Sequence, residues 1–141
     1  MVVDSGAGET VMSPDHLPQC PREDSDDSRS HQRYEVANGE SIPAMGQKRF
    51  TFVTVNGVSR RVCAQITKVN KALLSVSQVC GKDHRVVFDK VESYIEDKVT
   101  GERIPLEEKN GTYSLLCWVR NGPNDTEMSA QRPATFAGQR R

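Results

Sequence analysis

The sequence lacks the features that mark membrane, secreted or nucleic-acid-binding proteins. Its 141 residues contain no run of about 18 apolar residues, which a membrane-spanning helix requires. The first residues lack the basic and apolar regions of a signal peptide. Lys and Arg together number 19, as do Asp and Glu, so no excess positive charge attracts nucleic acid or an anionic membrane. We therefore expect a cytoplasmic protein with no direct nucleic-acid or membrane partner.

Aromatic residues and cysteines are also few. Aromatics make up 6% and hydrophobic residues 35% of the chain, which suits one modest core in a single domain. No two cysteines have the close spacing of a structural zinc site, so no metal site is expected. The chain has four of them, Cys20, Cys63, Cys80 and Cys117. We expect reduced thiols, with Cys63 and Cys80 buried as small apolar side chains.

Composition changes along the chain. Residues 1–14 are apolar and then glycine-rich, whereas 15–33 are polar and predict a solvated loop. Residues 34–119 carry nearly all of the β pattern. Residues 120–141 are rich in Gly, Pro, Asn, Gln and Arg without periodicity, which predicts a disordered tail.

The β pattern is clearest in two neighbouring stretches, 48–55 and 58–67. Both alternate with period two, which is typical of half-buried strands. The Asn56-Gly57 dipeptide between them favours the positive φ angles of a tight turn, so we expect an antiparallel hairpin. Further turns are predicted at Asn38-Gly39, Thr100-Gly101 and Asn110-Gly111.

The remaining pattern predicts an all-β fold with one short helix. The helix begins at Ser75 or Ser77 as its cap and ends at Gly81. Further strands are expected near 91–98, 102–106 and 112–119.

The motif with the most chemical content is Asp4-Ser5-Gly6-Ala7, which follows two β-branched residues. This is the pattern of an aspartic protease active-site loop. Asp4 supplies a carboxylate, and Gly6 permits a tight turn and a close backbone approach. Ser5 supplies a small hydroxyl that can fix the loop, and Ala7 leaves space for a substrate backbone.

Aspartic protease chemistry needs a second carboxylate that shares a proton with the first, because two like charges in contact cannot both ionise. The nearest further candidates, Asp89 and Asp97, lack the following Ser/Thr-Gly. The second carboxylate is therefore expected from another copy of the chain, which predicts a symmetric homodimer with Asp4 beside its counterpart.

At this point the chain resembles the retropepsin-like proteases of copia-type retrotransposons. The segments that carry the resemblance are Asp4-Ser5-Gly6-Ala7 with Thr10-Val11-Met12-Ser13, then 36–46, then 72–80. The second segment resembles the flap hairpin that closes over a bound peptide. The third resembles the apolar-apolar-Gly segment that leads into the retropepsin helix, with Leu73-Leu74-Ser75 here. Residues 86–118 resemble the linker between protease and integrase in copia-type polyproteins.

The resemblance implies a retropepsin-like closed barrel with a flap hairpin, one short α-helix and C-terminal β-hairpins. It implies a protease domain over 1–88, a pre-integrase-like β linker over 89–119 and a tail over 120–141. Asp4 would be catalytic, supported in its loop by Ser5, Gly6, Ala7 and Thr10, and the flap would contact substrate through Ala37, Asn38 and Gly39. The implied substrate is the element's own Pol polyprotein, in the cytoplasm within virus-like particles. No metal or organic cofactor is implied.

The chain departs from the family pattern in two places. Many viral members carry an acidic residue and a partner Arg where this chain has Gly8 and Val76. Family members also have an N-terminal strand before the catalytic Asp, where this chain has three residues. The chain is therefore expected to be a fragment of a longer reading frame or a decayed copy. Alternatives to an active protease are a catalytically inactive β-barrel fragment, a domesticated binding module or a domesticated cellular protease.

Overall fold

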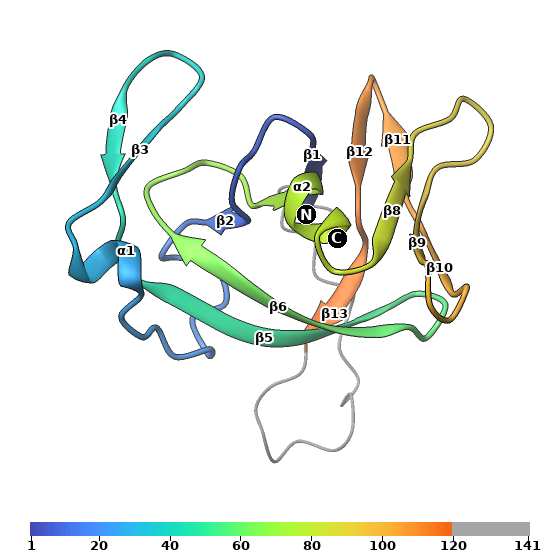
Figure 1. Ribbon diagram of the computed structural model, residues 1–141, viewed down its shortest axis with the longest axis horizontal. Coiled ribbons are helices and arrows are strands. Elements are labelled where there is room, and N and C mark those ends of the chain that lie inside the picture. The colour runs from blue at the N-terminus through green and yellow to red at the C-terminus, as the bar shows by residue number, and fades with distance from the viewer. Residues whose placement is uncertain (120–141) are drawn as a thin grey trace.

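An eight-stranded sheet is the largest element of the computed structural model, which describes residues 1–119 (Figure 1). Its strands, in spatial order, are β11 (Glu107–Lys109), β12 (Thr112–Ser114), β1 (Val2–Asp4), β7 (Leu73–Ser75), β2 (Val11–Met12), β6 (Ser59–Ile66), β5 (Gln47–Thr54) and β13 (Cys117–Val119). Smaller sheets are formed by β10 (Arg103–Pro105), β9 (Tyr94–Asp97) and β8 (His84–Val87), and by β3 (Arg33–Glu35) and β4 (Ser41–Pro43). The helices are α1 (Asp26–Arg29) and α2 (Val76–Cys80). The all-β class is thus confirmed.

The longest strands, β5 and β6, form the predicted antiparallel hairpin. Burial alternates along β5, as the period-two pattern requires of a strand with one face on the core. Gly57 has a φ of +87°, and its amide donates to the Thr54 carbonyl at 3.0 Å. Asn56 does not share the positive φ, so the turn is a three-residue loop with its left-handed residue last.

Strand β7 lies between β1 and β2, and this arrangement positions the N-terminal motif. β1 runs parallel to β7, with Asp4 opposite Ser75. β2 pairs antiparallel with β7 and parallel with β6. The loop that connects β1 to β2 therefore crosses the end of β7, directly beside the start of α2.

One core joins the main sheet to the three-stranded sheet. Ile95 and Ile104, from β9 and β10, belong to the same buried cluster as the side chains of the main sheet. The largest buried apolar members of that cluster include Met1, Met12, Phe50, Phe52, Ile66, Leu74 and Leu115. In Figure 1 the β3–β4 hairpin and the three-stranded sheet lie at opposite ends of the long β5–β6 hairpin.

The structure corrects several expectations about individual elements. The polar segment 15–33 contains a second helix, α1, because Ser25 and Ser28 form a reciprocal capping box. The stretch 112–119 is two strands, since β12 pairs with β1 while β13 pairs with β5. Cys80 is exposed rather than buried, and Cys63 is half-buried. The four cysteines, all within residues 1–119, form no disulfide bond.

The strands beyond the expected domain boundary at 88/89 pair in sheets with strands that precede it, β9 and β10 with β8 and the last three strands with the main sheet. β11 and β12 extend the sheet beside β1, and β13 forms its other edge. The pairing of these described strands is that of an open sheet, with β11 and β13 as its two edge strands. The tail expected over 120–141 lies outside the described residues.

Candidate functional site

Asp4 is the last residue of β1 and is half-buried. Its Oδ1 accepts a hydrogen bond from the Gly6 amide at 2.7 Å, which turns the chain sharply after the strand. A Cβ atom on Gly6 would lie 3.3 Å from that oxygen, so a larger residue would crowd the carboxylate. Among the described residues, no hydrogen bond reaches the second carboxylate oxygen of Asp4. One oxygen is therefore committed to the loop, and the other is available to a ligand.

The loop after Asp4 is fastened to β7 and α2 by buried polar contacts. The Ser75 hydroxyl donates to the Ala7 carbonyl at 2.7 Å, and the Ser75 amide donates to Thr10 Oγ1 at 3.0 Å. Gln78 continues this network: its Oε1 accepts from the Thr10 amide at 3.0 Å, and its Nε2 donates to Glu9 Oε1 at 2.9 Å. Ser75 and Thr10 are buried, so the bond between them is shielded from water, and the other three bonds are partly shielded. The network holds the loop in one conformation.

The segment expected to be a flap is the β3–β4 hairpin. At its tip the Val36 amide donates to the Glu40 carbonyl at 2.9 Å, and the Gly39 amide donates to the Val36 carbonyl at 2.8 Å. Gly39 has a φ of +88°, which a side chain would disfavour. The Asn38 side chain accepts from the Glu40 amide at 2.9 Å and closes the tip. The tip is therefore a short turn held by its own backbone.

A cleft of about 910 Å³ separates the Asp4 loop from this hairpin. Its apolar lining includes Ala7, Val11, Val36, Ala37, Ile42, Val69 and Leu73. Its ionisable groups are Asp4, Glu9, Arg33, Tyr34 and Glu35. An extended peptide could place apolar side chains on the first set and its scissile bond near the Asp4 carboxylate. The cleft is thus large enough for a ligand and has a carboxylate in its wall.

Most of the predicted site residues line this cleft, namely Asp4, Gly6, Ala7, Ala37 and Gly39. Ser5, Thr10 and Asn38 do not. Ser5 is exposed, Asn38 bonds within the hairpin tip, and Thr10 is buried beneath the loop.

Sequence reasoning missed several residues that shape the site. Ser75 was recognised as a possible helix cap, and it does accept from the Gln78 amide, but its bond to Ala7 was not foreseen. Gln78 and Tyr34 carried no signal at all, since a single Gln on a short helix and a single Tyr in a strand are ordinary residues. These contacts join segments that are distant in sequence, so local patterns cannot reveal them.

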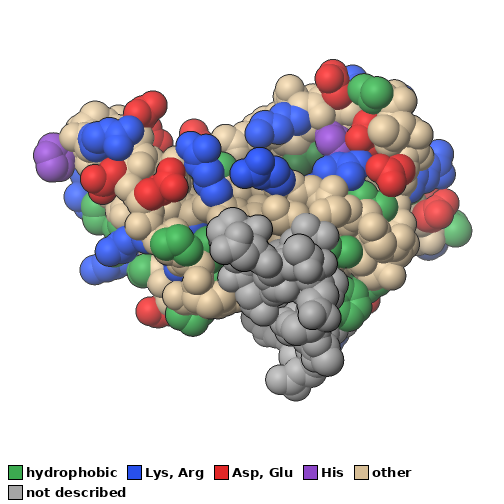
Figure 2. Space-filling model, turned by 90° about the horizontal axis from the view of Figure 1, so that it is seen from below, with side chains coloured by type: hydrophobic (Ala, Val, Ile, Leu, Met, Phe, Trp, Pro, Cys, Tyr) green, Lys and Arg blue, Asp and Glu red, His purple; other side chains and the backbone are tan. Residues whose placement is uncertain are grey.

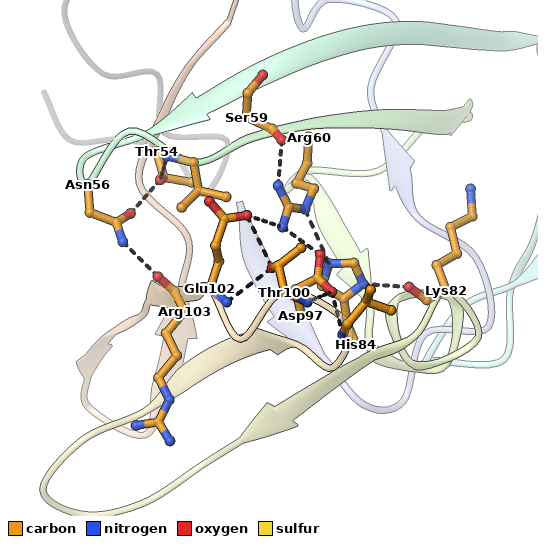
Figure 3. A network of polar contacts seen from close by, with 12 residues as sticks. Thr54, Asn56, Ser59, Arg60, Lys82, His84, Asp97, Thr100, Glu102 and Arg103 are labelled. Atoms are coloured by element: carbon orange, nitrogen blue, oxygen red, sulfur yellow. Dashed lines mark hydrogen bonds and ion pairs between the residues drawn. The ribbon is translucent and has the colours of Figure 1, made fainter.

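The two further aspartates considered as catalytic candidates, Asp89 and Asp97, do not line the cleft. Asp97 belongs to an ion-pair network in which Arg60 Nη2 lies 2.8 Å from Asp97 Oδ2 and 3.0 Å from Glu102 Oε1 (Figure 3). The backbone amides of Thr100 and Val99 hold the pKa of Asp97 below its ordinary value, and nearby positive groups add to this effect. The network joins β6 to the β9–β10 turn, so its role is to dock the three-stranded sheet.

On the face drawn in Figure 2, several basic side chains lie across the middle and acidic side chains lie mainly on both sides of them. Within residues 1–119, no three His, Cys, Asp or Glu side chains are grouped closely enough to hold a metal ion. Neither α1 nor α2 has the length and apolar character of a membrane-spanning helix.

The cleft and the side chains that line it are the features of the molecule that bear on its function. No family model matches the chain, and neither does any curated protein or solved structure.

Proposed function

We propose that the chain is one half of an aspartic endopeptidase of retropepsin type, encoded in the Pol polyprotein of a copia-like retrotransposon. The observation that carries this proposal is the position of Asp4. Its carboxylate lies in the wall of a peptide-sized cleft, opposite a hairpin with a glycine at its tip. A carboxylate, a turn that leaves it accessible and a cover over the cleft are the parts that one copy of the chain would contribute to such an enzyme.

The chemistry uses Asp4 from two copies of the chain. When the two carboxyl groups are in contact they share one proton, because both cannot carry charge at that distance. The ionised carboxylate removes a proton from a water molecule, which attacks the peptide carbonyl carbon. The protonated carboxyl group donates its proton to the carbonyl oxygen and stabilises the tetrahedral intermediate. Transfer of a proton to the leaving nitrogen then breaks the C–N bond.

The contacts around Asp4 support this role. The Gly6 amide donates to Asp4 Oδ1, and the hydrogen bonds of Ser75 and Gln78 fix the loop. The carboxylate therefore keeps one orientation. Oδ2 has no hydrogen bond from the described residues and is the oxygen that meets the partner copy. Fixed orientation is what a proton-sharing pair needs, since both groups must stay within hydrogen-bond reach.

The order of elements supports the retropepsin-like fold as part of the proposal. The Asp-containing loop follows β1, the hairpin follows in the chain, and β7 runs beside β1 into a short helix. The closed barrel of that family and the homodimer belong to the proposal in the same way. The substrate is a polypeptide, namely the element's own polyprotein processed in the cytoplasm within virus-like particles.

The direct test is peptide cleavage by the purified chain and by Asp4→Asn. The wild-type chain is expected to cleave peptides with apolar residues at the scissile bond, with a maximum at mildly acidic pH. Asp4→Asn removes the group that exchanges protons with water and peptide, so kcat/KM should fall on the order of 10²–10⁴-fold. Asp24→Asn, at an exposed site away from the cleft lining, makes the same chemical change and should leave cleavage intact.

The mechanism is contradicted if cleavage survives Asp4→Asn. Sedimentation of the same samples tests the dimer, because an active chain must associate. A chain that stays monomeric at high concentration, cleaves no peptide and binds no pepstatin-type inhibitor is instead the inactive fragment or binding module.

A further inference from the structure

We propose that Tyr34 and Asp27 form a latch that holds the β3–β4 hairpin over the cleft. Both are positioning residues, since the latch acts on the hairpin rather than on a reacting atom. The consequence for cleavage rests on the proposed function, whereas the mechanical role of the latch does not. The latch gives α1 a function, because Asp27 belongs to this helix.

The geometry of the tyrosine hydroxyl defines the latch. Tyr34 lies in β3 and is one of the residues that line the cleft. Its hydroxyl donates to Asp27 Oδ2 at 2.7 Å and lies 3.4 Å from Gln65 Oε1 on β6. The hydroxyl has one proton and faces two acceptors, so the short bond to the carboxylate receives it. Three elements, β3, α1 and β6, therefore meet at one oxygen atom.

The protonation of the Tyr34 hydroxyl is suited to a lasting hydrogen bond. Partial burial raises the pKa of the Tyr34 hydroxyl well above its ordinary value, and the hydrogen bond and charge of Asp27 raise it further. The phenol thus stays protonated across the neutral range and keeps its proton available for the bond.

The rest of the hairpin has few connections to the main sheet, which is why one side-chain bond matters. β3 and β4 pair with each other and form a separate two-stranded sheet. At the end of β4 the Thr67 hydroxyl donates to the Pro43 carbonyl at 2.8 Å, and just beyond it the Met45 amide donates to the Ile66 carbonyl at 2.8 Å. On the β3 side, the Tyr34 hydroxyl bonds to α1. The backbone bridge between Glu23 and Gln47 in turn ties the segment before α1 to β5. Loss of the Tyr34 bond should let the hairpin pivot about its β4 attachment.

The test is amide hydrogen exchange in the full chain with Tyr34→Phe, which keeps the ring and removes the hydroxyl. Three amides close the base of the hairpin: Gln32 to Asp27, Ala44 to Gln32, and Met45 to Ile66. Their exchange should become about tenfold faster, which corresponds to about 1.4 kcal/mol of opening free energy. Amides within β5 and β6 should keep their rates. Tyr113→Phe removes a phenol hydroxyl elsewhere and should leave the hairpin base unchanged.

Variants at Asp27 distinguish loss of the Tyr34–Asp27 hydrogen bond from a general destabilisation of the hairpin. Asp27→Ala removes the acceptor and should match Tyr34→Phe, whereas Asp27→Asn keeps an acceptor oxygen and should restore most of the protection. The double variant Tyr34→Phe with Asp27→Ala should exchange no faster than either single variant, because both remove the same bond. Unchanged exchange at the hairpin base, equal acceleration in β5 and β6, or additive effects of the two changes would each overturn the latch.

Cleavage measurements link the latch to the proposed function. In a chain that cleaves peptide, Tyr34→Phe should raise KM several-fold and change kcat little, because the hairpin covers bound substrate while Asp4 performs the chemistry. A fall in kcat at unchanged KM would contradict the positioning role. A chain that cleaves nothing overturns the peptidase proposal alone, since the exchange experiment needs no activity.

Discussion

The two walls of the cleft are held in opposite ways. The Asp4 loop is fastened by Ser75 of β7 and Gln78 of α2. These two residues bond to Ala7, Glu9 and Thr10 within the loop. The β3–β4 hairpin is a separate two-stranded sheet, and side-chain bonds from Tyr34 and Thr67 connect it to the body. The Asp4 loop is therefore tied to the main sheet, whereas the β3–β4 hairpin lies beside that sheet.

Under the proposed function, this difference matches the different demands on the two walls. A reacting carboxylate must keep its position to within a fraction of an ångström, and buried hydrogen bonds provide that. A cover must open to admit an extended peptide, so it can have only a few bonds to the body. We expect the loop to open only with global unfolding and the hairpin to open locally at much lower free energy.

The largest expected effect comes from Gly46→Ala, at the junction of the hairpin with β5. Gly46 has a φ of +119°, and an added Cβ would lie 2.5 Å from the Glu23 carbonyl oxygen. That oxygen accepts from the Gln47 amide, so the clash must break the bridge between these segments. We expect a loss of about 3 kcal/mol in unfolding free energy, measured by urea denaturation.

Gly81→Ala is the matched control for this change. Gly81 has an ordinary helical φ of −68°, and an added Cβ would lie 3.4 Å from the Ser77 carbonyl oxygen. The substitution should therefore change the unfolding free energy little. Equal losses in the two variants would show that the clash at Gly46 is relieved at no cost.

A smaller effect is expected from Thr10→Val, which tests the fixed wall. Valine has nearly the same shape but cannot accept from the Ser75 amide, which would be left buried and unpaired. The expected cost is about 2 kcal/mol of unfolding free energy. Thr51→Val, on the half-buried face of β5, makes the same chemical change and should cost far less. If Thr10→Val proves neutral, the loop is not held by this network.

The smallest global effect is expected from Gly39→Ala, at the tip of the movable wall. Gly39 and Gly57 have nearly equal φ values, +88° and +87°, and an added Cβ would meet nothing within 4 Å at either position. Each substitution should strain its own turn by about 1 kcal/mol. Gly57→Ala strains the central hairpin and should lower global stability by that amount.

Gly39→Ala should accelerate exchange in residues 36–40 and leave global stability nearly unchanged, because the hairpin opens before the body unfolds. An equal loss of global stability in both variants would mean that the two hairpins unfold together. That result would contradict the expectation that the β3–β4 hairpin opens before the rest of the molecule unfolds.

The sequence predicted what short-range patterns encode. Period-two alternation and Asn56-Gly57 located the central hairpin, and Asn38-Gly39 located the tip of the second one. The sequence did not predict elements whose local pattern is weak or unusual. The box that caps α1 uses Ser28 where Glu or Gln is typical. The stretch 112–119 reads as one strand, although it divides between β12, which lies next to the edge strand β11, and β13 at the opposite edge.

By itself the sequence determined the strand-rich class and the Asp4 turn, because alternation, turn dipeptides and a glycine two residues after a carboxylate act within a few residues of chain. Only the tertiary structure decided what surrounds that carboxylate. Ser75 is 71 positions from Asp4 in sequence but pairs beside it, and Asp27, Tyr34 and Gln65 meet at one hydroxyl from three elements. Such contacts depend on how strands are ordered in the sheet, and that order is set by burial of the whole core rather than by any local motif.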